Sequence, residues 1–153
     1  MAVITISRQI GSSGEAIARG VAEHLGFVFI DRAGLEDLVL TYGLDEVDLP
    51  RIQERPPNFL ERLYSDRKLY LQLVESFIRD TAEYENFVLI GRGGQCVFKD
   101  SENAFHVRVV ASERNRIENL MEAESLEREK ARSRLIEAER TQQRFVETLY
   151  GRS

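Results

Sequence analysis

The spacing of apolar residues divides the start of the chain into a strand, a turn and a helix. Residues 2–7 alternate and are rich in β-branched side chains, which is typical of a strand. Glycine and serine interrupt this pattern over 11–14. Apolar residues then recur at helical spacing from Gly14 to Leu25, and Gly26 stands where a helix C-terminal cap is expected. The sequence therefore predicts a strand that passes through a tight turn directly into a helix.

The same criteria predict further elements in alternating order. The continuous apolar run at 87–90 is typical of a central parallel strand, whereas the acidic and proline-containing stretch within 32–66 indicates an inserted flap. Further strands are predicted over 27–30, 87–90 and 105–111, and further helices over 32–42, 68–84, 112–122 and 126–150. Strands that alternate with helices predict a parallel sheet with right-handed crossovers, and hence a three-layer α/β fold.

Composition limits the class of protein. With 153 residues and 42% apolar content, the chain is expected to form one domain, residues 1–153, with a substantial core. The single cysteine, Cys96, cannot form an internal disulfide, and no secretory signal or membrane-length apolar run is present, so we expect a cytoplasmic protein without a membrane partner. The net charge of −5 argues against general nucleic-acid binding.

Arginine dominates the basic residues, because only three of the 21 are lysines. Its planar fork suits bidentate contact with phosphate oxygens, although a solvated helical surface of Glu–Arg pairs is the alternative interpretation. In the C-terminal part, Arg140 and Arg144 lie four residues apart on one face of the predicted helix, where two guanidinium groups could close over a phosphoryl group.

The first candidate site is the turn between the first strand and the first helix. Its layout is that of a phosphate-binding loop, in which backbone N–H groups cradle phosphates. Gly14 and Glu15, however, stand where that pattern places its lysine and its Ser or Thr, and Arg8 is the nearest basic residue able to replace the lysine. The alternative is plain helix capping, since Ser12 and Glu15 have the spacing of a capping box.

The second candidate is the glycine-rich turn at residues 91–94, which follows the central strand. Flanking glycines would let Arg92 extend into a cleft and pair with a substrate phosphate; a tight turn with a surface arginine is the alternative. His24 and His106 lack metal-ligand spacing and Cys96 has no evident partner base, so these residues are expected to be structural and no metal site is predicted.

Four stretches together, residues 6–18, 25–32, 88–94 and 107–116, resemble the cytidylate kinase-like family of P-loop proteins over nearly the whole chain. The resemblance implies an ATP phosphate loop, a nucleoside monophosphate-binding insertion over 32–66 and a lid or C-terminal helix over 125–150. It implies roles for these residues: Gly11, Ser12, Ser13, Gly14, Glu15 and Ala16 in binding ATP, Asp31 and Arg92 in binding the acceptor, and Arg8, Arg140 and Arg144 in catalysis.

The chain also departs from the kinases of that resemblance. Gly93 replaces the aspartate of their Gly-Arg-Asp motif, residues 141–143 replace the aspartates beside the lid arginines, and the final strand and helix of those kinases are not matched. The expected function is a nucleoside monophosphate kinase that transfers the γ-phosphoryl group of ATP, with Mg²⁺, to CMP, dCMP or a related acceptor. The alternative is a nucleotide-binding or regulatory module that has lost the chemistry. Nucleotide substrates are the expected partners, with a homodimer as a further expectation.

Overall fold

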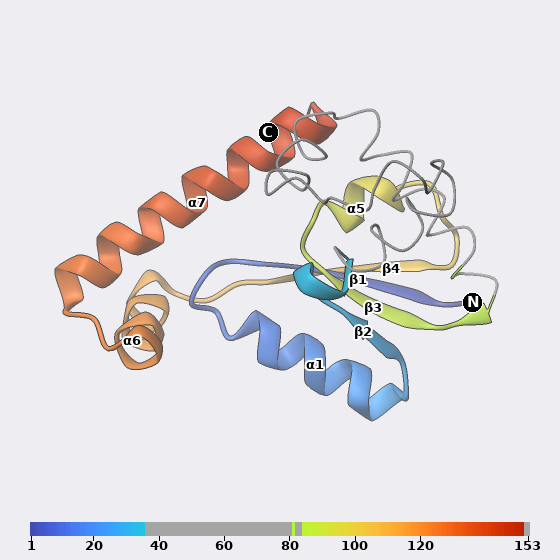
Figure 1. Ribbon diagram of the computed structural model, residues 1–153, viewed down its shortest axis with the longest axis horizontal. Helices are drawn as coiled ribbons and strands as arrows, with labels where there is room; N and C mark the ends of the chain where they lie inside the picture. Colours follow the sequence, from blue (N-terminus) through green and yellow to red (C-terminus); the bar gives the residue numbers. More distant parts are fainter. Residues whose placement is uncertain (36–80, 82–83, 152–153) are drawn as a thin grey trace, which may run out of the picture.

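A four-stranded parallel sheet forms the centre of the molecule (Figure 1). The computed structural model describes residues 1–35, 81 and 84–151. Its strands are β1 (Val3–Arg8), β2 (Val28–Ile30), β3 (Phe87–Ile90) and β4 (Ala104–Val109). They lie in the order β2-β3-β1-β4, and every neighbouring pair is parallel. The predicted α/β fold is confirmed.

Helices flank the sheet and extend beyond its carboxyl edge. They are α1 (Gly14–Leu25), α5 (Gly94–Val97), α6 (Glu113–Glu124) and α7 (Arg128–Tyr150). Figure 1 shows α1 against one face of the sheet and α5 on the other, with α6 beyond the carboxyl ends of the strands and α7 returning from it toward α5. None of the described helices is long and apolar enough to cross a membrane.

The predicted boundaries agree best where one strand is buried on both faces. The strand at 87–90 was predicted with its observed bounds. The strand predicted to reach residue 111 ends at Val109, because its pairing with β1 ends where Arg8 faces Val109. Of the helix predicted over 32–42, residues 32–35 are helical, and the remainder lies outside the described residues. Of the helix predicted over 68–84, residues 81 and 84 are described and are helical, and the remainder lies outside the described residues, as does most of the insertion over 32–66.

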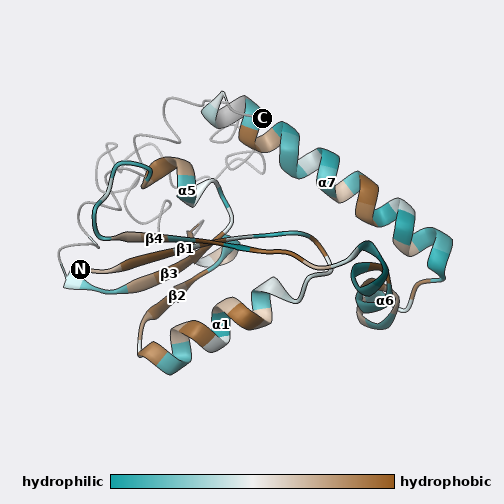
Figure 2. Cartoon of the chain, turned by 180° about the vertical axis from the view of Figure 1, so that it is seen from behind, coloured by the Kyte–Doolittle hydropathy of each residue, from teal (hydrophilic) through white to brown (hydrophobic). Residues whose placement is uncertain are grey.

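The main core lies between α1 and the sheet. β3 is buried along its whole length, as expected for a central strand covered on both faces. Figure 2 shows apolar and hydrophilic residues alternating along α1, as expected for an amphipathic helix. The fully buried members of this cluster are Ile6, Ala18, Ala22, Val88 and Ile90. Because the two alanines are small, the helix backbone can lie close to the sheet, which fixes where the loop at the start of α1 begins.

A second, smaller apolar cluster joins α6 to α7. Its buried members are Ile117, Leu120, Ala131 and Leu135. Ile10, from the loop after β1, packs against this cluster. The hairpin formed by α6 and α7 is therefore attached to that loop by apolar packing and is distinct from the core beneath the sheet.

Candidate functional site

The first loop, residues 8–16, has a backbone shaped by two left-handed residues. Gly11 has φ 74° and Ser13 has φ 60°, a conformation that a residue with a side chain adopts at some cost. Ser13 is the N-cap of α1, but its side chain makes no capping hydrogen bond. The Ser12 hydroxyl instead donates to the Gln9 carbonyl oxygen at 2.6 Å. The capping box suggested by Ser12 and Glu15 is therefore not formed.

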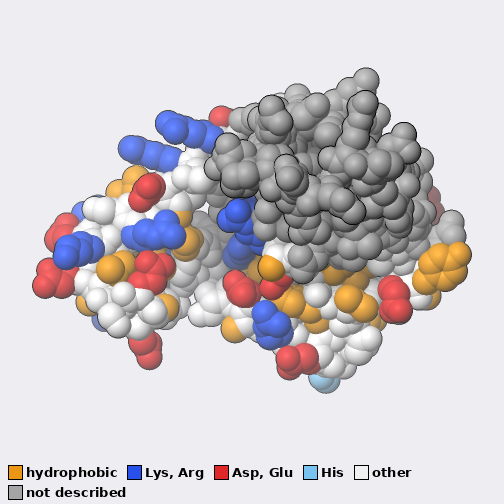
Figure 3. Space-filling view, viewed as in Figure 1, with side chains coloured by type: hydrophobic (Ala, Val, Ile, Leu, Met, Phe, Trp, Pro, Cys, Tyr) orange, Lys and Arg blue, Asp and Glu red, His pale blue; other side chains and the backbone are white. Residues whose placement is uncertain are grey.

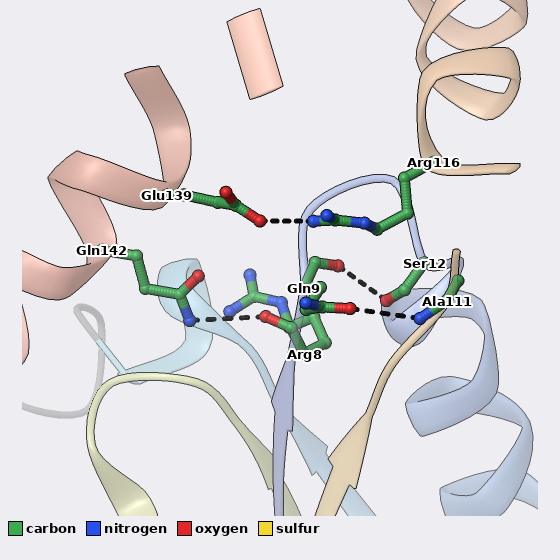
Figure 4. A network of polar contacts seen from close by, with 7 residues as sticks. All are labelled: Arg8, Gln9, Ser12, Ala111, Arg116, Glu139 and Gln142. Carbon is green, nitrogen blue, oxygen red and sulfur yellow. Dashed lines mark hydrogen bonds and ion pairs between the residues drawn. The ribbon is translucent and has the colours of Figure 1, made fainter. Parts of the chain in front are cut away.

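The first loop is held in place from several sides (Figure 4). The Gln9 side-chain oxygen accepts a hydrogen bond from the backbone N–H of Ala111 at 3.2 Å. On the other side, the Asn119 amide of α6 donates to the carbonyl oxygen of Gly11 at 2.8 Å and to the hydroxyl of Ser13 at 3.3 Å. One side-chain amide, from a helix distant in the sequence, thus holds both left-handed residues and fixes the backbone conformation of the loop.

Arg8 crosses the first loop and reaches the second. A Cβ atom added at Gly14 would overlap the Cβ of Arg8, so the arginine stem occupies the space that a longer side chain at residue 14 would need. A Cβ added at Gly91 would lie 2.5 Å from Nη1 of Arg8, so the guanidinium lies against the second loop. Glycine at both positions leaves room for this arginine, and its positive charge lies between the two turns.

Burial makes the charged form of Arg8 less stable than it is in water. Desolvation lowers the pKa of Arg8 from its ordinary value, Glu15 opposes that shift, and the neighbouring charge of Arg92 adds to it. Arginine stays protonated at physiological pH despite such a shift. A partly desolvated cation beside a second cation is stabilised by a bound anion, so the two arginines favour a phosphate group between them.

The second loop, residues 91–94, begins with three consecutive left-handed residues. Gly91, Arg92 and Gly93 have φ values of 74°, 55° and 71°. The N–H of Gly91 donates to the carbonyl oxygen of Ile6 at 2.8 Å, which continues the pairing of β3 with β1 into the turn. Arg92 is half-buried, and its guanidinium carbon lies 5.0 Å from the centre of the Phe145 ring of α7. The turn is therefore packed against a helix, unlike the surface turn of the alternative interpretation.

A cleft of about 900 Å³ lies between the two loops and the hairpin of α6 and α7. The predicted site residues that line it are Arg8, Gly11, Ser12, Ser13, Gly14, Glu15 and Arg92. Both turns that the sequence predicts as separate candidate sites therefore line one cleft. Concave sites at the carboxyl ends of parallel strands are where open α/β sheets bind their ligands.

Arg140 and Arg144 lie on a different face of α7. Both side chains are exposed and line a shallow depression on the helix, while Gln142 and Phe145 line the cleft. Arg134 is the α7 arginine that lines the cleft. The predicted pair therefore shares one helix face, but that face is directed away from the first loop.

Asp31 and Ala16 are likewise absent from the cleft lining of the described residues. The Asp31 carboxylate accepts a hydrogen bond from the N–H of Gly34 at 2.9 Å, and its carbonyl oxygen accepts one from the N–H of Leu35 at 2.9 Å. Its other carboxylate oxygen lies 3.8 Å from Nη2 of Arg19. In this structure Asp31 caps the helical turn at 32–35, which is a structural role.

An ion pair between a buried arginine and a half-exposed glutamate joins α6 to α7 beside the first loop. Arg116 of α6 is buried and pairs with Glu139 of α7 (Figure 4), and a Cβ at Gly11 would lie 2.5 Å from the Arg116 carbonyl oxygen. The sequence offered Arg116 only as one of the many arginines of the chain, and Asn119 was missed altogether. The only signal was the position of both residues on the helix after β4, because their partners are distant in the sequence.

Most other arginines of α6 and α7 do form solvated pairs with glutamates. In Figure 3, Lys or Arg and Asp or Glu side chains alternate over these two helices. The exposed pairs join Arg114 and Arg128 to Glu118, Arg132 to Glu113, and Arg134 to Glu124. The Arg114 guanidinium lowers the pKa of the Glu118 carboxyl through a hydrogen bond. These residues fit the alternative interpretation of a charged helical surface.

The residues expected to be structural lie away from the cleft. Nδ1 of His106 lies 2.6 Å from the hydroxyl oxygen of Thr5 on the neighbouring strand, and His24 is exposed near the end of α1. Cys96 is half-buried in α5. Among the residues that the structure describes, no group of three His, Cys, Asp or Glu side chains could hold a metal ion.

A parallel sheet whose first strand passes through a glycine-containing turn into the first helix defines a class, the P-loop kinase-like α/β proteins. The model of the cytidylate kinase-like family matches residues 3–153, and the chain belongs to this family. The family and the fold together support a kinase-like, nucleotide-binding protein. No curated protein matches the chain.

Solved structures are similar to the chain at low sequence identity, and the first of the following three shares its fold. An uncharacterized protein from Eubacterium ventriosum ATCC 27560 aligns with a TM-score of 0.67 and 19% identity, covering 93% of this chain and 73% of its own. TT1252 from Thermus thermophilus aligns with a TM-score of 0.47 and 16% identity over 87% of this chain and 78% of its own. Shikimate kinase from Bacteroides thetaiotaomicron aligns with a TM-score of 0.47 and 16% identity, covering 94% of this chain and 80% of its own.

Proposed function

We propose that this protein is a phosphotransferase that moves the γ-phosphoryl group of ATP to CMP, dCMP or a related phosphorylated acceptor. The observation that carries the proposal is the position of Arg8, whose stem fills the space beside Gly14 and whose guanidinium lies against Gly91. It supplies a cation between the two turns although residue 14 is not a lysine. A cation there is suited to bridge the oxygens of a triphosphate held by the first loop and of an acceptor held by the second.

The proposed reaction depends on positioning and charge neutralisation. Phosphoryl transfer requires attacking and leaving oxygens roughly in line and cations around the transferring group, and little covalent chemistry from the protein. In this proposal the amides at the start of α1 hold the ATP phosphates, Arg8 neutralises charge on the transferred group, and Arg92 grips the acceptor phosphate. The cleft of about 900 Å³ is large enough for both nucleotides.

Magnesium is implied by this reaction, but the described residues do not form a site for it. The Ser12 hydroxyl donates to the Gln9 carbonyl oxygen, and the Glu15 carboxylate lies 3.8 Å from Nη2 of Arg19. The described residues contain no group of three metal-ligating side chains. We therefore assign no protein ligand to Mg²⁺ and derive no step through it; phosphate oxygens of ATP are themselves good ligands for this ion.

A second candidate function, a nucleotide-binding or regulatory module without transferase activity, is favoured by the orientation of α7. Arg140 and Arg144 lie outside the cleft lining, so the pair that the resemblance assigns to catalysis does not face the first loop. Such a module would keep phosphate binding by backbone amides and lack the further cations that Arg140 and Arg144 would supply in the transition state.

Turnover with a panel of nucleoside monophosphates separates these candidates. The full chain is incubated with ATP, Mg²⁺ and each monophosphate, CMP and dCMP included, and phosphorylated product is measured. A kinase should lose about 10³-fold in kcat in Arg8→Ala, since a cation at the transferring group contributes that much. Arg8→Lys should restore part of it, and both variants should keep the wild-type circular dichroism spectrum.

The outcomes are distinct. Product formation that depends on Arg8 supports the kinase. No product with any acceptor, while ATP or CMP still raises the melting temperature, supports the binding module instead. Neither turnover nor a thermal shift contradicts both functions.

A further inference from the structure

Helix α7 contacts the second loop through two aromatic side chains. The Tyr150 hydroxyl donates to the backbone carbonyl oxygen of Arg92 at 2.8 Å. The ring of Phe145 lies 5.0 Å from the guanidinium carbon of the same arginine. One helix therefore contacts both the backbone and the side chain of Arg92, at a point distant from it in the sequence.

The residue after Arg92, Gly93, leaves space for the Tyr150 ring. Gly93 is buried with φ 71°, and a Cβ atom added there would overlap the Tyr150 ring. An aspartate at this position, as in the Gly-Arg-Asp motif, cannot share the space with that ring. Gly93 therefore differs from the aspartate of the motif for a local reason. The Tyr150 ring of α7 occupies the space that an aspartate side chain would need.

We propose that Tyr150 and Phe145 are positioning residues, which hold the Arg92 guanidinium toward the cleft and so set the affinity for the acceptor phosphate. This inference rests on the proposed function, because it assumes that Arg92 binds the acceptor. Arg92 has φ 55°, which residues with side chains rarely adopt, so an outside contact is needed to favour that conformation. The Tyr150 hydrogen bond supplies one at the carbonyl group of that residue.

The Phe145 contact is compatible with phosphate binding by the same guanidinium. An aromatic ring attracts the face of a guanidinium group, whereas carboxylates and phosphates accept hydrogen bonds from the N–H groups in its plane. Stacking and bidentate phosphate binding therefore use different directions of one group. The ring limits how far the arginine can turn, and this lowers the entropy lost when a phosphate binds.

Chemical labelling tests the positioning without requiring any substrate. The full chain and the variants Tyr150→Phe and Phe145→Leu are treated with phenylglyoxal, and modification of Arg92 is followed by peptide mass spectrometry. We expect Arg92 to react about threefold faster in both variants, as the loss of a cation–π contact or of its support predicts. Tyr84→Phe and Phe105→Leu are matched controls, because these side chains are 74% and 67% exposed. Equal reaction rates in all five proteins would overturn the inference.

Kinetics test the consequence for the acceptor. With CMP and ATP as probes, both variants should raise KM for CMP about tenfold and leave kcat and KM for ATP within about twofold, since only acceptor binding is altered. Phe145→Tyr keeps a ring and should restore KM for CMP, which a general packing defect would not allow. Faster labelling with an unchanged KM for CMP contradicts the positioning role, as does an equal change in both KM values.

Failure of the proposed function has a different signature. If the wild-type chain neither turns over CMP nor binds any monophosphate of the panel, the kinase proposal and the acceptor role of Arg92 are both lost. In that case the labelling rates still decide whether Tyr150 and Phe145 hold Arg92, because phenylglyoxal reports on the guanidinium itself.

Discussion

The two loops at the carboxyl edge of the sheet obtain their positive charge in different ways. The first loop has no cation at residue 14 and receives the Arg8 guanidinium from the end of β1, across a glycine that leaves room for its stem. The second loop carries its own cation, Arg92, and receives packing from α7. A phosphate-binding turn and its cation can therefore be separate in the sequence, provided that small residues allow the side chain to cross.

Moving the cation into the first loop should have the largest effect on the difference between the two loops. Gly14→Lys alone should lower kcat/KM by at least about 10²-fold and destabilise the protein, because its Cβ overlaps Arg8 and neither cation can then be placed. The double variant Arg8→Gly with Gly14→Lys removes the overlap and should regain more than tenfold of the loss. The readouts are coupled turnover and thermal unfolding. A double variant no better than Gly14→Lys alone would show that Arg8 does not stand in for the lysine.

A substitution in the second loop should also disturb the first. Gly91→Ala places a methyl group against Nη1 of Arg8, and its left-handed φ of 74° disfavours alanine. We expect a loss of about 1–2 kcal/mol in the free energy of unfolding, measured with urea, and about tenfold in kcat. Gly20→Ala is the matched control, because this exposed position in α1 has open space around it and should be neutral or slightly stabilised. If instead KM for CMP changes and kcat does not, the contact between Gly91 and Arg8 serves acceptor binding at the second loop.

Asn119→Ala should weaken the first loop and leave the second intact. Its amide holds both Gly11 and Ser13, so losing it should raise KM for ATP about fivefold to tenfold, equivalent to about 1 kcal/mol for the lost hydrogen bonds. KM for CMP should not change. Asn115→Ala is the control on the same helix, since that side chain is exposed. Equal effects of the two substitutions would mean that Asn119 acts only through helix stability.

The smallest expected effect is at Asp31. Its carboxylate caps the turn at 32–35, so Asp31→Ala should cost about 1 kcal/mol of folding stability, measured by chemical denaturation. Asp100→Ala, an exposed residue paired only with its neighbour Lys99 in the described structure, should cost less than about 0.5 kcal/mol. If Asp31→Ala instead raises KM for CMP without loss of stability, the acceptor role that the resemblance implies for Asp31 is supported.

Local patterns in the sequence predicted the sheet and the two loops. Strand 87–90 was predicted with its observed bounds because a central strand is apolar throughout, and the turn into α1 was marked by glycines. The capping box of Ser12 and Glu15 was not formed, because the N-cap of α1 is Ser13 and both the N–H and the hydroxyl group of Ser12 donate to the Gln9 carbonyl oxygen. A spacing rule could not choose between these two serines.

Relations between distant segments could not be predicted in this way. Which face of α7 meets the cleft depends on how the cluster around Leu135 docks, so the spacing of Arg140 and Arg144 placed them on one face without revealing its direction. The contact of Asn119 with Gly11 joins residues 108 positions apart. The catalytic role of Arg140 and Arg144 therefore stays a prediction.

The unequal burial of α7 has a consequence for its local stability. Among its described side chains, Ala131 and Leu135 near its start are buried, whereas the middle of the helix from 140 to 144 is exposed and the end is held by the contacts of Phe145 and Tyr150. Backbone amides should therefore exchange with deuterium most slowly from Ala131 to Leu135, after the first residues whose N–H groups have no intrahelical acceptor, and faster in the middle of the helix. A phosphorylated ligand that orders Arg92 should slow exchange in the last turns, which makes the end of this helix a reporter of occupancy that needs no product to be formed.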